Sequence, residues 1–340
     1  MSFQIGPYTI HSRLLLAPMA GITDKPYRDI CRRYGAGLVS SEMITSDLAM
    51  LNTQKTQSRL IQADEPEPRS VQIVGTDPQK MAEAARYNVE IGANIIDINM
   101  GCPAKKVCNK LAGSALMQDE KLVEKILKSV VQAIDIPVTL KTRTGWNYKN
   151  RNAINIAKIA EDCGISCITI HGRTRNQAYT GFAEHETIRQ IKKAIKIPVI
   201  ANGDIKDASD ARFILDYTHV DGLMLGRITR GQPWIFKQIN DELSDNKPPA
   251  PIGNQEKKNL IITHIQDINK ILHKEENTPF IPKRQRVRQM KIARKYIGWY
   301  LYNLMDQDDN LLKKYRREIF SIDDAELQII KLEEILNRLL

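Results

Sequence analysis

Short apolar runs rich in β-forming residues recur along the first two thirds of the chain, at intervals of roughly 30 residues. Each run is followed by a stretch with helical periodicity. One such helix begins at Asp77, an N-cap residue, and Pro78, with Met81, Ala85 and Val89 spaced by four. Others are predicted around Leu122, Ile126, Val130 and Ala133 and over residues 152–162, 184–195 and 207–217. We expect eight strands, near Leu14–Ala17, Leu38–Ser41, Ser70–Val74, Ile95–Ile98, Val138–Lys141, Cys167–Ile170, Val199–Ala201 and Gly222–Leu225.

A short internal sequence repeat supports a repeating strand–helix unit. The sequence Ala-Ile-Asp-Ile-Pro-Val at 133–138 returns as Ala-Ile-Lys-Ile-Pro-Val at 194–199, 61 residues later, which is about two βα units. Eight such units in about 230 residues predict an α/β fold, a (β/α)8 TIM barrel. A doubly wound sheet is the alternative. It is disfavoured because no Gly-x-Gly-x-x-Gly follows the first strand.

The pattern changes at residues 245–251, where three prolines within four residues cannot continue a helix and indicate a linker. Almost everything after it has helix-forming composition. We therefore predict a catalytic barrel domain over residues 1–243 and a small C-terminal all-α domain over residues 252–340.

Composition narrows the class of protein. Apolar residues make up 42% of the chain and charged residues 26%, a balance typical of globular proteins and not of disordered or collagen-like chains. No apolar run approaches the ~20 residues of a membrane-spanning helix. The first ten residues lack the basic and apolar regions of a signal peptide. We expect a cytoplasmic protein without a membrane partner.

The five cysteines form no Cys-x-x-Cys pair and no zinc-type spacing with histidine. An odd number in a chain expected to be cytosolic indicates free thiols, one of which is a candidate for reactivity. No metal site is predicted. The cysteines are Cys31, Cys102, Cys108, Cys163 and Cys167.

The net charge of +10 suggests a polyanionic partner. Two dense basic runs lie in the tail, over residues 283–295 and 313–317, and either form a solvated helix face or bind a nucleic-acid backbone. Helical spacing places four of these cations on one face: Arg284, Arg288, Lys291 and Lys295. We assign the aromatic residues that follow mostly to the core of the tail: Tyr296, Trp299, Tyr300 and Tyr302.

Function in a barrel lies at the carboxyl ends of the strands, and in this chain those ends are polar. Each residue there has a structural alternative. Lys141 could extend to solvent, His171 could be a satisfied rim histidine, Gln72 could cap a loop and Cys102 could be a small core residue. Their repeated occurrence at the same edge favours one shared site.

The strand ends also indicate a cofactor. Gly203 and Gly226 free backbone N–H groups for an anion where barrels commonly bind phosphate, and Arg227 adds charge there. Lys141 would stabilise an anionic ring, and Gln72 could hydrogen-bond a ring amide edge. This combination suits flavin mononucleotide (FMN).

Four motifs resemble those of a known enzyme family. They are Ala17-Pro18-Met19-Ala20-Gly21-Ile22-Thr23-Asp24, Asn99-Met100-Gly101-Cys102-Pro103, His171-Gly172-Arg173-Thr174 and Asn202-Gly203-Asp204. The chain resembles the tRNA-dihydrouridine synthases over its whole length, and most closely their bacterial B-type group. The resemblance implies FMN-dependent reduction of the C5=C6 bond of specific uridines in tRNA, with NADPH as reductant. It implies hydride transfer from flavin N5 to C6 and a proton from Cys102 to C5.

The resemblance also assigns residues by position. It implies Cys102 as the catalytic residue and His171 as a residue close to the flavin and the substrate base. From their chemistry and their place at the strand ends, Asn99 is expected to bind the uracil edge and Arg173 to bind a nearby phosphate of the substrate. The implied flavin contacts are Pro18, Met19, Ala20, Gln72, Lys141, Asn202, Gly203, Asp204, Gly226 and Arg227. Reaching a flavin at a barrel mouth requires the target base to leave its stack.

Two other functions remain open at the level of sequence. A flavin barrel acting on a free pyrimidine, similar to a dihydroorotate dehydrogenase, would explain the barrel and the thiol but leave the tail without a role. An RNA-binding protein that keeps a flavin only for stability would explain the tail. A monomer is expected, because it would suit a bulky RNA partner.

Overall fold

The computed structural model describes residues 2–50, 60–61, 64–245, 251–274, 283–305 and 308–340, with the side chains of 245, 270–274 and 283–289 excepted. The chain forms two compact units. The first comprises Met1–Gly226 with Ile239–Lys247, and the second comprises Arg227–Gln238 with Pro248–Leu340. The predicted division at 243 and 252 stays a prediction.

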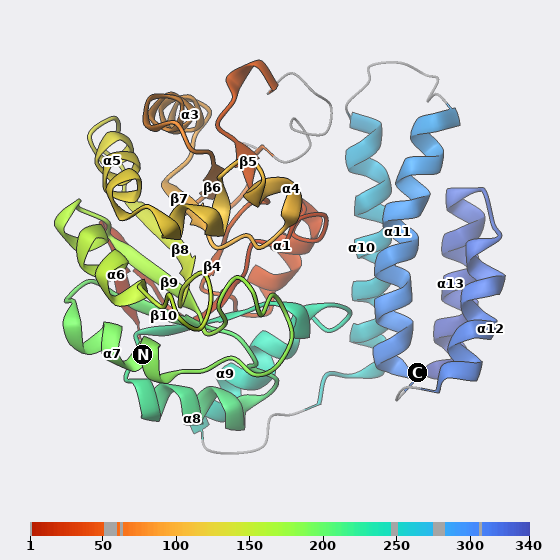
Figure 1. Cartoon of the computed structure of the whole chain (residues 1–340). Helices are drawn as coiled ribbons and strands as arrows, with labels where there is room; N and C mark the ends of the chain where they lie inside the picture. Colours follow the sequence, from red (N-terminus) through yellow and green to blue (C-terminus); the bar gives the residue numbers. More distant parts are fainter. Residues whose placement is uncertain (1, 51–59, 62–63, 246–250, 275–282, 306–307) are drawn as a thin grey trace. The chain divides into compact units, whose positions relative to one another are not determined.

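The first unit is built on a parallel sheet that curls into a TIM barrel, as the sequence predicts (Figure 1). The order of its strands is β4-β3-β11-β10-β9-β8-β7-β6-β5. A parallel bridge between Ser40 and Ser70 closes the ring, and the two hydroxyls lie 2.9 Å apart. The strands are β3 Leu14–Leu16, β4 Leu38–Val39, β5 Ile44–Thr45, β6 Ser70–Val74, β7 Ile95–Met100, β8 Val138–Arg143, β9 Cys167–His171, β10 Val199–Asn202 and β11 Gly222–Leu225.

All eight predicted strands are present, and the second is divided. Its first part, β4, pairs with β3, whereas β5 a few residues later pairs with β6. Ser40 lies in the interval between the two parts, and its bridge to Ser70 joins the end of β4, one edge of the sheet, to the first residue of β6, which is next to the other edge. The division therefore lets one segment complete the ring.

Helices cover the outside of the ring (Figure 1). The predicted N-cap at Asp77 is confirmed, because its carboxylate accepts from the Lys80 backbone N–H at 2.9 Å. The helices of this unit are α1 Lys25–Arg33, α3 Pro78–Glu90, α4 Lys105–Cys108, α5 Glu120–Val131, α6 Ala153–Asp162, α7 Glu186–Ala194 and α8 Ala208–Thr218, and α9 Ile235–Asp245 joins it in part.

A hairpin that the sequence analysis missed precedes the barrel. Strands β1 Phe3–Ile5 and β2 Tyr8–Ile10 pair antiparallel around Gly6, whose φ of +56° suits glycine. Its apolar side chains join an interior cluster with one residue from each of several barrel strands, including Leu15, Leu38, Ile95, Cys167 and Ile200. The hairpin thus contributes to the apolar layer of the barrel interior.

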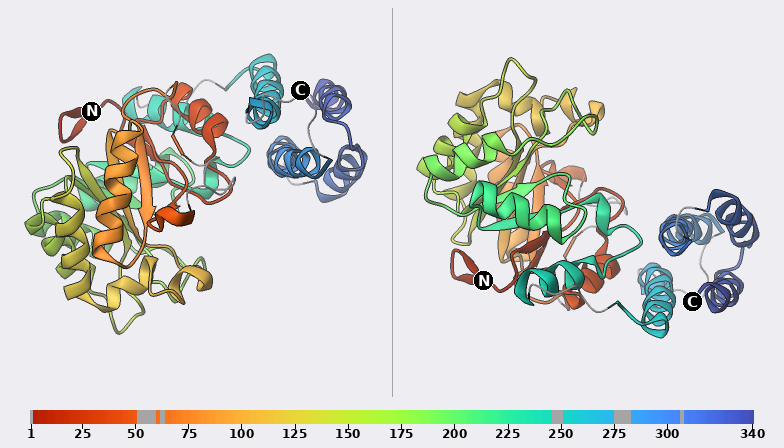
Figure 2. Two further views of the ribbon diagram at one scale, coloured as in Figure 1. Left: turned by 90° about the horizontal axis from the view of Figure 1, so that it is seen from above. Right: turned by 90° about the horizontal axis from the view of Figure 1, so that it is seen from below.

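In the described part of the second unit, the long helices are α10 Asn254–Lys274, α11 Lys283–Leu304, α12 Asp309–Phe320 and α13 Ala325–Leu339, which Figure 2 shows nearly end-on. Helix α10 packs on α11 and α13, and α12 packs on α11 and α13. Its buried centre holds His264, Tyr296 and Tyr300, with 2.8 Å between His264 Nδ1 and the Tyr300 hydroxyl. Among the described helices, none is both long enough and apolar enough to span a membrane.

Candidate functional site

The barrel interior changes from apolar to polar toward the carboxyl ends of the strands. Side chains two residues apart on a strand share a face, so Asp97 and Asn99 face the same side as Ile95 of the interior cluster. Asp97 lies between Gln72 on β6 and Thr139 on β8, which are its register partners. The polar side chains that the sequence places at the strand ends therefore form one layer of the barrel interior.

The side chains of this layer bind one another. The Asp97 carboxylate accepts from the Thr139 hydroxyl at 2.7 Å and from Gln72 Nε2 at 2.6 Å. Gln72 Oε1 accepts from Asn99 Nδ2 at 2.7 Å. Asn99 Oδ1 in turn accepts from the backbone N–H groups of Cys102 at 3.0 Å and Gly101 at 3.2 Å. Gln72, a predicted flavin ligand, thus already uses one donor and its oxygen within the protein.

Cys102 follows β7 and differs from the other cysteines. All five thiols are free, but Cys102 is partly exposed whereas the other four are buried. Partial burial raises the pKa of the Cys102 thiol above its ordinary value. The thiol is therefore protonated at neutral pH, as an acid that donates a proton must be.

The Cys102 backbone is held on its carbonyl side as well. Its oxygen accepts from the Ser114 hydroxyl at 2.9 Å and from the Ser114 N–H at 3.2 Å. Gly113 has φ of +62°, and a Cβ there would lie 2.9 Å from the Cys102 oxygen. Glycine is therefore required for this close approach.

Lys141 is a half-buried cation in the strand-end layer. Its Nζ donates to Asn202 Oδ1 at 2.9 Å, and Asn202 Nδ2 donates to the Met224 carbonyl at 2.7 Å. Burial, reinforced by the charge of Arg143, lowers the pKa of Lys141 to about 8. Positive charge is concentrated here, which suits an anionic ligand.

Arg173, a predicted substrate-binding residue, binds Asp204, a predicted flavin contact. The Arg173 guanidinium is 3% exposed and donates to Asp204 Oδ2 at 2.8 Å and to the carbonyls of Thr180 and Gly181. His171 Nδ1 accepts from the Arg173 N–H at 3.2 Å. Arg173 therefore organises the loop after β9, and its predicted contact with substrate stays a prediction.

The segment after β3 adjoins the end of β11. The Ala17 N–H donates to the Leu225 carbonyl at 2.8 Å, and a Cβ on Gly226 would lie 4.0 Å from Met19 Sδ. The predicted flavin contacts Pro18 and Met19 are half-buried, and Ala20 is exposed. Gly203 has φ of +123°, the left-handed side that glycine tolerates.

These observations fit a flavin. The ammonium of Lys141 is half-buried, donates to a neutral amide oxygen and has a lowered pKa, so an anionic group such as a reduced ring or a phosphate would stabilise it. Within the described residues, no cluster of three His, Cys, Asp or Glu side chains could hold a metal ion.

Sequence reasoning gave no role to two buried charges of this layer. Arg143 donates to the Gly101 carbonyl at 2.7 Å and to the Thr174 and Ala178 carbonyls, so it ties the Cys102 loop to the loop after β9. Asp97 anchors the hydrogen-bond chain described above. Asp97 lies within the predicted strand Ile95–Ile98, where a charge in an apolar strand was the available signal. Arg143 lies two residues beyond the predicted strand Val138–Lys141, because β8 continues to Arg143.

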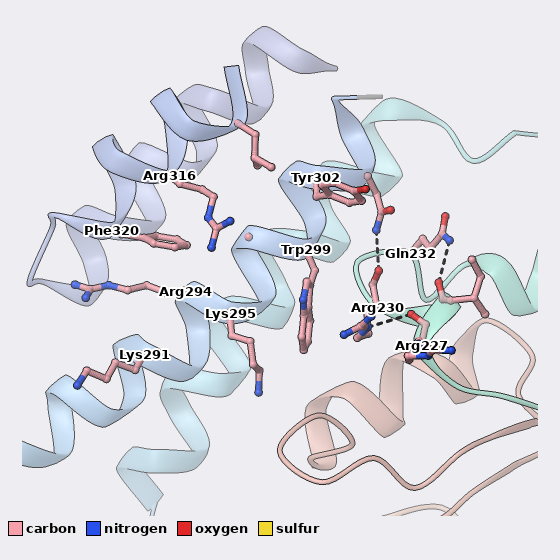
Figure 3. Close-up of a pocket in the computed structure, with 14 residues that line it drawn as sticks. Arg227, Arg230, Gln232, Lys291, Arg294, Lys295, Trp299, Tyr302, Arg316 and Phe320 are labelled. Atoms are coloured by element: carbon pink, nitrogen blue, oxygen red, sulfur yellow. Dashed lines mark hydrogen bonds between the residues drawn. The ribbon is translucent and has the colours of Figure 1, made fainter. Parts of the chain in front are cut away.

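The second unit carries a basic pocket of about 730 Å³ (Figure 3). Helix α11 supplies Trp299 and Tyr302, and α12 supplies Phe320. None of the fourteen described residues that line it is acidic. Its cations are Arg227, Arg230, Lys291, Arg294, Lys295 and Arg316.

Aromatic and cationic side chains alternate in this pocket. The Arg230 guanidinium lies 5.3 Å from the centre of the Trp299 ring, and Arg316 lies 5.3 Å from that of Phe320. Gly231 has φ of +71°, and a Cβ there would lie 2.3 Å from the Trp299 carbonyl oxygen. The backbone at Gly231 therefore packs closely on α11.

The predictions for the tail have mixed outcomes. Tyr296 and Tyr300 are fully buried, which confirms their assignment to the core. Trp299 and Tyr302 line the pocket instead, because they face away from that core. The side chains of Arg284 and Arg288 lie outside the described residues. Arg227 lies in the second unit and lines its pocket, and its predicted contact with the flavin stays a prediction.

Comparison with known proteins agrees with the geometry. The family model described as dihydrouridine synthase (Dus) matches residues 15–339. The tRNA-dihydrouridine synthase B of Pseudomonas syringae pv. tomato is 49% identical over 335 residues, which is 98% of this chain and 94% of that protein. The Vibrio vulnificus protein of the same name is 47% identical over 330 residues, 97% of each chain.

Solved structures support the fold alone. A 2-naphthoyl-CoA reductase in complex with 2-naphthoyl-CoA has a TM-score of 0.56 and 14% identity, over 73% of this chain and 52% of that chain.

The fold and these relatives together define a TIM-barrel oxidoreductase. The chain belongs to the dihydrouridine synthase family and is an oxidoreductase. The resemblance seen in the sequence motifs is thereby confirmed.

Proposed function

We propose that this enzyme reduces the C5=C6 bond of specific uridines in tRNA to 5,6-dihydrouridine, with FMN as cofactor and NADPH as reductant. The observation that carries the proposal is the position of Cys102. Cys102 carries a protonated, partly exposed thiol, and its backbone N–H and carbonyl oxygen are both hydrogen-bonded. It follows β7, the strand in which Asn99 is the register partner of Lys141. The relatives named tRNA-dihydrouridine synthase B support the same reaction.

The flavin would lie against the strand-end layer, with Lys141 and Gln72 at its ring and Asn202 orienting Lys141. Pro18, Met19, Ala20, Gly203, Asp204 and Gly226 would complete the contacts. FMN, when bound, supplies the hydride that reaches C6 of the uracil. Lys141 would stabilise negative charge beside the ring, because its ammonium is half-buried and hydrogen-bonded to a neutral oxygen.

Cys102 then supplies the proton. Hydride addition at C6 leaves an enolate-like charge over C5 and O4, and the Sγ–H of Cys102 donates its proton to C5. The raised pKa keeps that proton on sulfur until the charge develops. The net reaction adds one hydride and one proton to the base, and it uses no metal.

Asn99 would recognise the uracil edge. Its oxygen already accepts two backbone N–H groups, so the group that its amide offers to a substrate is an N–H. An N–H donor pairs with a carbonyl oxygen of uracil and not with the amino group of cytosine. We place His171 and Arg173 at the same edge, with Arg173 acting through the loop it holds.

The basic pocket of the second unit would bind the tRNA backbone. Its cations contact phosphates, and its aromatic faces accept an unstacked base. An enzyme that acts on tRNA with a nucleotide reductant would work in the cytoplasm, and one protomer would suffice to hold the RNA.

One stopped-flow experiment tests this function. The purified flavoprotein is reduced anaerobically and mixed with tRNA that lacks dihydrouridine, with free uridine as the control. We expect rapid reoxidation of the flavin by tRNA only. Reoxidation by free pyrimidines alone would contradict the proposal in favour of a small-molecule reductase. A protein that binds tRNA without flavin reoxidation would be an RNA-binding protein instead.

A further inference from the structure

The three hydrogen bonds that link Cys102 to Asp97 run in one direction. Each donor faces the Asp97 side of the chain: Cys102 N–H to Asn99, Asn99 Nδ2 to Gln72, and Gln72 Nε2 to Asp97. The Thr139 hydroxyl donates to the second carboxylate oxygen. A side-chain amide could equally well point the other way, so something must fix this direction.

The two ends of the chain fix it independently. A backbone N–H can only donate, so the amide that meets Cys102 must present its oxygen. An ionised carboxylate can only accept, so the amide that meets Asp97 must present its nitrogen. Two amides in series satisfy both conditions in just one arrangement, which is the one observed.

Register and burial make the chain rigid. Gln72, Asp97 and Thr139 are register neighbours on three adjacent strands, so the backbone ladder sets their separation. Gln72 is 1% exposed, Asp97 5% and Asn99 7%. Water is therefore excluded as a competing partner, and a broken link leaves a buried polar group unsatisfied.

We propose that Asp97 is a positioning residue for the reduction: by anchoring Gln72 it fixes the orientation of Asn99, which holds the Cys102 loop at the place where its thiol reaches the substrate. The inference rests on the proposed function, because it takes Cys102 as the proton donor. Asp97 acts through Gln72 and Asn99 and touches no reacting atom itself.

Two other roles for Asp97 make different predictions. As a counter-charge for Lys141, Asp97 would matter through its negative charge alone. As a purely structural residue, it would matter for folding alone. In the positioning role what matters is an acceptor oxygen that faces Gln72.

Three variants separate these roles. Asp97→Ala removes the acceptor. Asp97→Asn removes the charge but keeps an oxygen that can accept from Gln72 while its amide donates to the Thr139 hydroxyl. Thr139→Val, the matched control, removes a hydrogen bond to the same carboxylate and leaves the Gln72 link intact.

Two measurements are made on the purified flavoproteins, well below their melting temperatures. The first is the rate of Cys102 alkylation by iodoacetamide without substrate, followed by peptide mass spectrometry against the four buried cysteines. The second is kcat and KM for dihydrouridine formation on unmodified tRNA.

For Asp97→Ala we expect alkylation of Cys102 to be faster by about 3- to 10-fold, the equivalent of one lost hydrogen bond. We expect kcat to fall by up to about 100-fold through misplacement of the thiol, with an unchanged KM for tRNA. Asp97→Asn and Thr139→Val should stay within about 3-fold of the wild type in both measurements.

Equal damage from Asp97→Ala and Asp97→Asn would overturn the inference in favour of the counter-charge. A lowered melting temperature with unchanged alkylation and kcat would overturn it in favour of a structural role. If Asp97→Ala does not fold, Asp97→Ser replaces it, since its hydroxyl is too short to reach Gln72.

Failure of the proposed function gives a different result. In that case the wild type forms no dihydrouridine, whatever its alkylation rate. An active wild type with an unaffected Asp97→Ala variant contradicts only the positioning role.

Discussion

The strand-end layer of the barrel and the basic pocket of the second unit use polar side chains in opposite ways. In the barrel, amides, a hydroxyl and a carboxylate are buried and bind one another. In the pocket, Arg227, Lys291 and Arg316 are exposed and line an open hollow without acidic residues among those described. The strand-end layer holds its side chains in a fixed geometry, whereas the pocket concentrates positive charge.

The physical consequences differ accordingly. A buried network loses about 1–3 kcal/mol for each polar group left unsatisfied, and its members depend on one another. An exposed cation contributes little alone, and its effect on polyanion binding is additive and screened by salt. Single substitutions should therefore change catalysis sharply in the barrel and binding gradually in the pocket.

The largest effect is expected at Cys102. Cys102→Ala should slow dihydrouridine formation by about 100- to 10,000-fold, because the proton donor is lost. Flavin content and reduction by NADPH should be unchanged, since Lys141 and Gln72 remain. Turnover of unmodified tRNA by the variant, measured by mass spectrometry of its nucleosides, would contradict the assignment if it matched the wild type.

Lys141 tests the other half of the reaction. Lys141→Met keeps most of the side-chain length and removes the ammonium that donates to Asn202. We expect flavin reduction by NADPH to slow by about 100-fold, the usual cost of losing one preorganised charge contact. Anaerobic stopped-flow absorbance measures this rate, and an unaffected rate at full flavin content would show that Lys141 lies away from the ring.

A moderate effect is expected from the ionisation of Asp97. Burial raises its pKa to about 6, against lowering by the hydrogen bonds from Thr139 and Gln72 and by the charge of Lys141. The folded state thus holds this proton more tightly than the unfolded state. The contribution of Asp97 to stability is fully present below about pH 4 and is lost as the pH rises through about 6.

Asp97→Asn cannot ionise and should therefore gain stability relative to the wild type across that range, by about 1–3 kcal/mol. Urea unfolding of the two flavin-free proteins at several pH values between about 4 and 7 measures the difference. Parallel stability curves would show that Asp97 ionises in the folded protein as readily as in the unfolded chain.

The smallest effect is expected in the pocket. Arg316→Ala should weaken tRNA binding by a few-fold and reduce the salt dependence of log Kd by about one unit of slope. Arg317→Ala on the same helix is the matched control, because Arg317 is exposed but does not line the pocket. Equal effects of both variants would mean that overall charge and not the pocket binds the RNA.

The barrel was readable from the sequence because its strands are local, apolar and evenly spaced. The N-terminal hairpin was not predicted, although apolar and polar residues alternate on both sides of Gly6. Its strands are three residues each, too short for a periodic signal, and they are stabilised by the interior cluster they join.

The candidate site was also predictable only in part. A motif identified Asn99 and Cys102, and strand-end positions identified Gln72 and Lys141. The structure joins Gln72, Asn99 and the Cys102 backbone in one hydrogen-bond chain. The sequence placed Arg173 at the rim as a substrate contact, which stays a prediction, and only the structure shows that Arg173 is buried and binds Asp204. A sequence motif specifies which residues are present but not which of them bind one another.

The sequence alone determined the class of fold, the polar edge of the barrel and the family of the enzyme, because strand period, residue type and motif are properties of short segments. Only the tertiary structure decided that Asp97 anchors the Cys102 loop and that Trp299 lines a pocket while Tyr300 fills a core. These outcomes depend on which side chains strand register and helix packing bring within hydrogen-bonding or van der Waals distance, and those partners lie far apart along the chain.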